Sequence, residues 1–173
     1  RVSPVWCPGY SRAHEHTFHS STPRRCVVKA AVWHGKRDVR VDEVPDPTIT
    51  KPDDAIIRVT SSGLCGSDLH LYEVMAAFMT EGDILGHEPM GIVEAVGSDI
   101  TNLAVGDRVV VPFNISCGHC FMCSTGLQSQ CEVTQVREHG MGATLFGYTK
   151  LYGQVPGGQA EYFGWAVAVG GCD

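Results

Sequence analysis

Residues 117–131 have the sequence CGHCFMCSTGLQSQC, and this run decides how that part of the chain folds. Its four cysteines follow a C-x2-C-x2-C-x7-C spacing and are Cys117, Cys120, Cys123 and Cys131. Four thiolates this close together complete a tetrahedral shell around one zinc ion and leave no position for water or substrate. The spacing therefore predicts a structural zinc site in a lobe over residues 113–135.

Three other interpretations of the cysteine run compete with zinc. Disulfide-linked cysteines are typical of small secreted chains, but no apolar segment followed by a small-residue cleavage site occurs here. A nucleic-acid-binding zinc ribbon is disfavoured by the net charge of −6 and by the lack of Lys and Arg within the run. Disulfide exchange through Cys117 and Cys123 lacks a thioredoxin-like βαβ context. Metal-bound thiolates in a reducing, cytoplasmic compartment are the prediction.

The composition favours a mainly β fold. Charged residues make up only 18% of the chain and glycine occurs 20 times, a mixture typical of turn-rich β domains rather than helical bundles. Strands are predicted at residues 29–34, 39–44, 55–60, 91–96, 108–113 and 159–163. Residues 39–44 alternate apolar and polar side chains, which predicts a half-buried strand. No apolar run reaches the roughly 18 residues that cross a membrane.

Two shorter motifs contain further candidate metal ligands. Cys65 lies in GLCGSDLH at residues 63–70, and His87 and Glu88 lie in GHE at residues 86–88. A thiolate and an imidazole are ligands of catalytic zinc, and Glu88 is a third ligand or a neighbouring carboxylate. Each motif alone is weak, because a lone cysteine is most often a small buried residue and Gly-His-Glu is usually a solvated turn.

The first of these motifs also contains residues that suit proton transfer. Asp68 is placed to orient a metal ligand through a hydrogen bond. Ser67 and His70 together suit the transfer of a proton from a bound hydroxyl group to solvent, because the pKa of histidine lies near neutrality. Residues 67–80 have room for one or two helical turns.

The order of these motifs resembles the zinc-dependent medium-chain alcohol dehydrogenase family. Cys65 is followed by GHE at 86–88, VGDRV at 105–109 and then the four-cysteine run. Residues 112–120, PFNISCGHC, are similar to the subgroup with formaldehyde dehydrogenase-like and threonine dehydrogenase-like members. The resemblance covers roughly residues 28–162, with all motifs in register.

This resemblance implies a GroES-like catalytic domain, which is a twisted, partly open β-barrel with a few short helices. In that family zinc activates the alcohol oxygen and hydride passes to NAD(P). The resemblance implies one catalytic zinc bound by Cys65, His87 and Glu88, and one structural zinc bound by the four cysteines. It implies a proton relay of Ser67 and His70, with Asp68 beside the ligands. The implied substrate is a small alcohol or aldehyde, and full-length relatives are homo-oligomers; no nucleic-acid or membrane partner is expected.

One part of the family pattern is missing from these 173 residues. The nicotinamide-binding Rossmann fingerprint is G-x-G-x-x-G after a strand. Gly140 and Gly142 begin such a pattern, but Leu145 stands where the third glycine belongs. We therefore expect the Rossmann domain to be absent here. The alternative function is a stand-alone zinc-binding module without catalysis.

Both ends of the chain differ from the predicted domain at residues 28–162. Residues 1–27 are rich in Arg and Ser and predict a disordered extension, or alternatively an organellar transit peptide. Their H-x-H-x2-H pattern (His14, His16, His19) is either a metal site or incidental. Residues 163–173 form an atypical tail, in which Cys172 is a candidate for a missing zinc ligand. These ends suggest a fragment, a frame-shifted gene or a short form.

Overall fold

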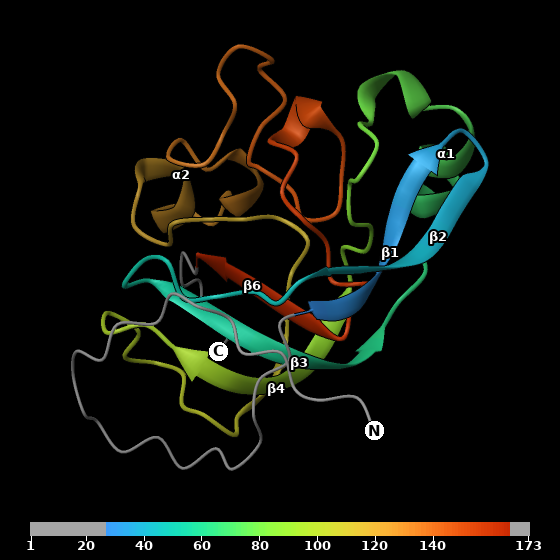
Figure 1. Cartoon of the computed structure of the whole chain (residues 1–173). Helices are drawn as coiled ribbons and strands as arrows, with labels where there is room; N and C mark the ends of the chain where they lie inside the picture. Colours follow the sequence, from blue (N-terminus) through green and yellow to red (C-terminus); the bar gives the residue numbers. More distant parts are fainter. Residues whose placement is uncertain (1–26, 167–173) are drawn as a thin grey trace, which may run out of the picture.

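The computed structural model describes residues 27–166 (Figure 1). Within this part the chain has six strands, two short α-helices and three 3-10 turns. The predictions for His14, His16, His19 and Cys172, and for most of both ends, lie outside the described residues. No helix in the described part is long and apolar enough to cross a bilayer.

The first two strands form an antiparallel hairpin. β1 (Val27–Gly35) pairs with β2 (Asp38–Pro45), with Ala31 opposite Val41. Val28, Ala30 and Val32 of β1 are buried on one face of the strand, and Trp33 beyond them is buried too. The strand prediction for residues 39–44 is confirmed, but its half-buried face is wrong: Val41 is 72% exposed. β2 is an edge strand, and no other described strand pairs with it.

The other four strands form an antiparallel sheet in the order β5-β4-β3-β6. β3 (Asp54–Ser62) lies at the centre between β4 (Pro89–Val96) and β6 (Tyr162–Ala166). β5 (Arg108–Val110) pairs with the outer side of β4. The described strands thus form two sheets, and neither closes into a barrel.

Two predicted strand boundaries are wrong. The strand predicted to end at residue 113 stops at Val110, because Pro112 has no N–H to donate to a ladder. The strand predicted at 159–163 starts later, at Tyr162, and runs to Ala166. Gln159 instead bonds with Leu85 and Ala31, which anchors it beside β1.

Short helical segments connect the strands. α1 (Gly66–Glu73) and the 3-10 turn η1 (Ala76–Phe78) lie within the predicted range of 67–80. α2 (Phe121–Ser124), η2 (Gln128–Gln130) and η3 (Lys150–Tyr152) follow later in the chain. In the view of Figure 1, α2 lies on the opposite side of the molecule from the hairpin and α1.

Two apolar clusters hold these elements together. One joins the four-stranded sheet to later loops and consists of Ile57, Val111, Ile115, Phe146 and Phe163. The rings of Phe146 and Phe163 meet edge to face at 4.9 Å. The other cluster joins β1 to α1 and to the loop before β4, and consists of Trp33, Leu71, Met79 and Leu85. The second cluster supports the segment that carries His87.

Candidate metal centres and active site

The four cysteines of the 117–131 run come together in a compact cluster. Their sulfur atoms all lie within 4.8 Å of one another. The Sγ atoms of Cys117 and Cys123 are 3.9 Å apart, as are those of Cys120 and Cys131. A disulfide needs about 2.05 Å, whereas a tetrahedral shell with Zn–S bonds of about 2.3 Å has edges of about 3.8 Å. The spacing fits zinc and excludes a disulfide between either pair.

Backbone N–H groups within the lobe point at the sulfurs. The N–H of Cys120 donates to Cys117 Sγ at 3.2 Å, and the N–H of Cys117 donates to Cys131 Sγ at 3.3 Å. Cys120 is also the N-cap of α2, where its sulfur accepts from the N–H of Cys123. Such bonds favour thiolates over thiols.

The cysteines of the cluster differ in how readily they ionise when no cation is present. Hydrogen bonds, of which the one from the Cys123 N–H is the strongest, lower the pKa of Cys120. Burial opposes ionisation of Cys131, but bonds from Thr134, Cys117 and Val133 outweigh it and lower its pKa to about 6. Burial and the neighbouring sulfurs raise the pKa of Cys123 to about 12. A bound zinc ion would supply positive charge that favours the thiolate form of Cys123.

The second cluster consists of Cys65, His87 and Glu88. One ligand atom from each lies within 4.8 Å of the others. Cys65 is partly buried, His87 is 8% exposed and Glu88 is exposed. The cluster offers three ligand atoms and is exposed to solvent on the side of Glu88. This matches a zinc site with three protein ligands and a free fourth coordination position.

Reciprocal bonds at the start of α1 position Cys65. Its Sγ accepts from the Ser67 N–H at 3.4 Å, and its own N–H donates to Asp68 Oδ2 at 2.8 Å. This is a capping box with cysteine in place of the usual hydroxyl residue.

Asp68 links Cys65 to His87. Its second oxygen, Oδ1, lies 3.5 Å from His87 Nδ1, which is within ion-pair distance. Both atoms are buried, and neither makes a hydrogen bond. With Nδ1 beside a carboxylate, Nε2 is the ring nitrogen left for a metal. Asp68 therefore contacts two of the three candidate ligands.

Tight backbone packing sets the position of His87. The preceding residues pair with β1, where the Leu85 N–H donates to Ala31 at 3.0 Å, and on the other side Leu85 accepts from Gln159 at 2.9 Å. Gly86 follows with φ of +98°, and a Cβ there would lie 2.4 Å from the Gln159 nitrogen. Only glycine fits both the conformation and the space.

Glu88 is held over a second glycine. A Cβ on Gly63 would lie 2.2 Å from Glu88 Oε2, and the Gly63 N–H donates to the Glu88 carbonyl at 3.0 Å. Gly63 thus lets the loop that carries Cys65 approach the loop that carries His87 and Glu88.

The two predicted relay residues lie one turn apart on α1. Ser67 is partly buried, with its hydroxyl 3.6 Å from Cys65 Sγ. His70 is exposed to solvent. Among the described residues, no hydrogen bond joins Ser67 directly to His70.

A cleft of about 150 Å³ opens beside His87. Its remaining walls come from Ser67 and from residues that the sequence did not single out, namely Phe113, Leu145, Phe146, Tyr148 and Tyr152. These residues lie far along the chain from Cys65. Phe113 falls within the segment PFNISCGHC, but no local motif marks any of them as part of a cleft. Only the folded structure reveals them.

Tyr148 is the aromatic residue most closely associated with the candidate ligands. Its ring meets that of His87 edge on, with centroids 6.2 Å apart, and meets Tyr152 in the same way at 5.4 Å. Its hydroxyl donates to the sulfur of Met75 at 3.6 Å, a weak acceptor. Burial raises the pKa of Tyr148, so its hydroxyl stays protonated at neutral pH.

The fold and these clusters define a class, a β domain with two groups of side chains able to hold metal ions. The chain belongs to the alcohol dehydrogenase GroES-like domain family, which it matches over residues 51–168. The predicted family and the mainly β, GroES-like fold are thereby confirmed.

Individual relatives support the assignment. The zinc-type alcohol dehydrogenase-like protein AdhB of Bacillus subtilis is 53% identical over 135 residues, which are 78% of this chain and 35% of that protein. Formaldehyde dismutase of Pseudomonas putida is 41% identical over 140 residues, covering 78% and 34%. The structure of alcohol dehydrogenase TADH from Thermus sp. ATN1 superposes with a TM-score of 0.68 at 40% identity, covering 79% and 36%. The chain spans about 35% of the length of these relatives.

We predict that Cys117→Ser and Cys65→Ser have different consequences. Loss of one sulfur from the closed cluster removes folding free energy, on the order of several kcal/mol, because a closed zinc site stabilises the lobe that it joins. Cys65→Ser should lose metal only from the open cluster and keep the fold. Zinc analysis with denaturant unfolding checks both variants. A Cys117→Ser chain that folds normally without zinc would contradict the structural role.

The Asp68→Asn variant tests the link between the two ligand-bearing loops. Removing the negative charge beside His87 Nδ1 should lower the zinc affinity of the open cluster about 10- to 100-fold. The exposed Asp99→Asn variant carries the same charge change and should leave the affinity unchanged. Competition against a chromophoric chelator measures both. Equal affinities in the two variants would show that Asp68 does not position the ligand.

Proposed function

We propose that this chain is the catalytic-domain portion of a zinc-dependent, NAD(P)-linked alcohol or aldehyde oxidoreductase. The observation that carries the proposal is the convergence of Cys65, His87 and Glu88 within 4.8 Å, beside a cleft that His87 itself lines. A metal site with an open side next to a cleft lined mainly by apolar side chains suits catalysis. The closed four-cysteine cluster suits structural support.

The donor set of the open cluster fits zinc. A thiolate, an imidazole and a carboxylate are all zinc ligands, and the contact of Asp68 with His87 Nδ1 supports Nε2 as the coordinating atom. When bound, zinc acts as a Lewis acid that makes an alcohol oxygen acidic near neutral pH.

Two residues of α1 are proposed to move the proton that the alcohol loses. Ser67 lines the cleft, so its hydroxyl is placed to accept a hydrogen bond from a substrate hydroxyl. His70 lies one turn further along the helix and faces solvent, where an imidazole can release a proton to water. Because no direct bond joins the two, the transfer between them requires a substrate or water bridge.

The chemistry of the cleft walls favours an uncharged substrate. None of the lining residues carries a Lys, Arg, Asp or Glu side chain, and five of the seven are aromatic or aliphatic. A small alcohol or aldehyde with an apolar substituent therefore suits it better than a phosphorylated sugar alcohol, whose phosphate would find no Lys or Arg among the lining residues.

Other parts of the assignment follow from the family. We propose a catalytic domain at residues 28–162 with a structural zinc lobe at 113–135, and a hydride acceptor, NAD or NADP, bound outside this segment. Reduced, metal-bound thiolates suit a cytoplasmic location. Assembly into homo-oligomers is proposed from the family alone.

His87→Ala tests the proposal in the full-length protein. Loss of this ligand should reduce alcohol-dependent formation of NAD(P)H to background, while the fold is kept, because the four-cysteine cluster is untouched. His139→Ala, which removes an exposed histidine, is the control and should retain activity. Retained turnover in His87→Ala would contradict a catalytic zinc. Zinc binding without any turnover in the unmodified protein would favour the stand-alone zinc module.

A further inference from the structure

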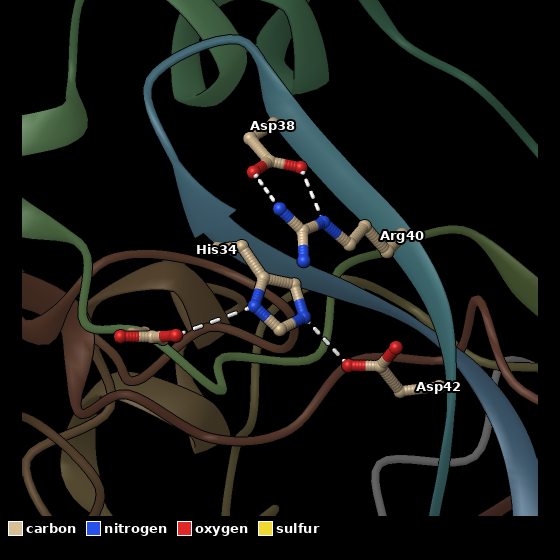
Figure 2. A network of polar contacts seen from close by, with 5 residues as sticks. His34, Asp38, Arg40 and Asp42 are labelled. Atoms are coloured by element: carbon tan, nitrogen blue, oxygen red, sulfur yellow. Dashed lines mark hydrogen bonds and ion pairs between the residues drawn. The ribbon is translucent and has the colours of Figure 1, made fainter.

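His34 on β1 lies between two carboxylates that come from different segments (Figure 2). Its Nε2 is 2.5 Å from Asp42 Oδ2 on β2, and its Nδ1 is 3.3 Å from Glu81 Oε1 in the loop before β4. One imidazole ring therefore joins the hairpin to the loop that continues to His87.

The charges around His34 favour its protonated form. Arg40, also on β2, is occupied by Asp38 through two bonds of 2.8 and 2.6 Å, so its charge is largely matched (Figure 2). The bond with Asp42 raises the pKa of His34 above its ordinary 6.5, and Glu81 adds to this; burial and Arg40 oppose it. Among the residues that the structure describes, Asp42, Glu81, Arg40 and Asp38 are the charged groups that act on the His34 ring.

This geometry does not suit a metal ion. The two carboxylates contact opposite nitrogens of the ring, so their oxygens do not converge on one point beside a single nitrogen. A proton on each nitrogen satisfies both contacts, because a protonated imidazole donates from both sides.

Loss of one proton breaks this symmetry. A neutral imidazole has one donor and one acceptor, so one carboxylate must then face a lone pair. The Asp42 contact is the shorter, and the Asp42 side chain is 37% exposed against 74% for Glu81. The neutral ring therefore keeps its bond to Asp42, and the contact with Glu81 is lost.

Glu81 is the first residue of the strip that leads to His87. The next residue, Gly82, donates to Trp33 at 2.9 Å, and Trp33 donates back to Asp83 at 2.8 Å. The strip then continues through Leu85, which bonds to Ala31. The Glu81 contact thus lies at the exposed end of a backbone ladder whose other end holds a candidate ligand.

We propose that His34 acts as a proton-operated latch. When both of its ring nitrogens carry a proton, the ring holds Glu81 and the strip 81–87 against β1. When one of these protons is lost, the Glu81 end of the strip is released. The backbone hydrogen bonds between the strip and β1 still form after release, but they open more often, beginning at Gly82. A group with a raised pKa stabilises the fold below its unfolded pKa and loses that contribution as pH rises through the folded value. The latch is therefore closed in mild acid and opens as pH rises. This pH-dependent release of the strip does not depend on what His87 binds.

Amide hydrogen exchange on the whole zinc-loaded chain tests the latch. Protection of the Gly82 and Leu85 amides is measured relative to Val93 in β4, at about pH 5.5 and about pH 8.5. The unmodified chain should show several-fold higher relative protection at the lower pH. Glu81→Ala should show low protection at both.

Glu81→Gln provides the decisive variant. Its amide can accept a bond from the protonated ring and donate one to the neutral ring, so protection should stay high at both pH values. Glu43→Gln removes an exposed carboxylate from the adjacent position on β2 and should behave like the unmodified chain.

Three outcomes would overturn the latch. They are equal relative protection of the unmodified chain at both pH values, a Glu81→Gln variant that keeps the pH dependence, and a Glu43→Gln variant that loses it. An NMR titration of the His34 ring gives an independent result even if a variant folds poorly. A His34 pKa above 6.5 that falls in Asp42→Asn supports the latch, and an ordinary pKa contradicts it.

Discussion

The backbone bonding of the strip before His87 is the constraint on which the open cluster depends. The strip lies between β1 and the later segment at 157–159, and it forms hydrogen bonds with both. Gly86 then turns with a positive φ where no side chain would fit. This packing places His87 against Cys65, although 22 positions separate the two residues in the sequence. Three segments far apart in the chain must therefore fold together before the cluster exists.

The two clusters solve different electrostatic problems. The four sulfurs are mostly buried and close together, so without a cation at least one of them remains a thiol, as the raised pKa of Cys123 indicates. The open cluster mixes one sulfur, one nitrogen and one carboxylate and borders the cleft. As a rule for zinc, a closed shell suits structural stability and a shell with an open position suits chemistry.

Local patterns predicted much of this structure and failed where distant contacts decide. The cysteine spacing predicted the compact cluster, since all four residues lie in one loop, and most strand positions followed from β-branched runs. The exposure of Val41 could not be predicted, because alternation does not show whether another element covers a strand. The walls of the cleft, such as Tyr148, have no sequence signal, since only tertiary folding brings them to His87. Charges from two other segments, β2 and the loop before β4, likewise create the environment of His34 on β1.

We infer that the chain holds two zinc ions in unlike shells. Zinc analysis together with X-ray absorption at the zinc edge, on the fully loaded chain, distinguishes the two shells. We expect two zinc ions per chain, one surrounded by sulfur alone and one by a single sulfur with nitrogen and oxygen ligands. The second shell should disappear in His87→Ala while the first remains. A single zinc ion with four sulfur ligands, unchanged by that substitution, would show that Cys65, His87 and Glu88 bind no zinc.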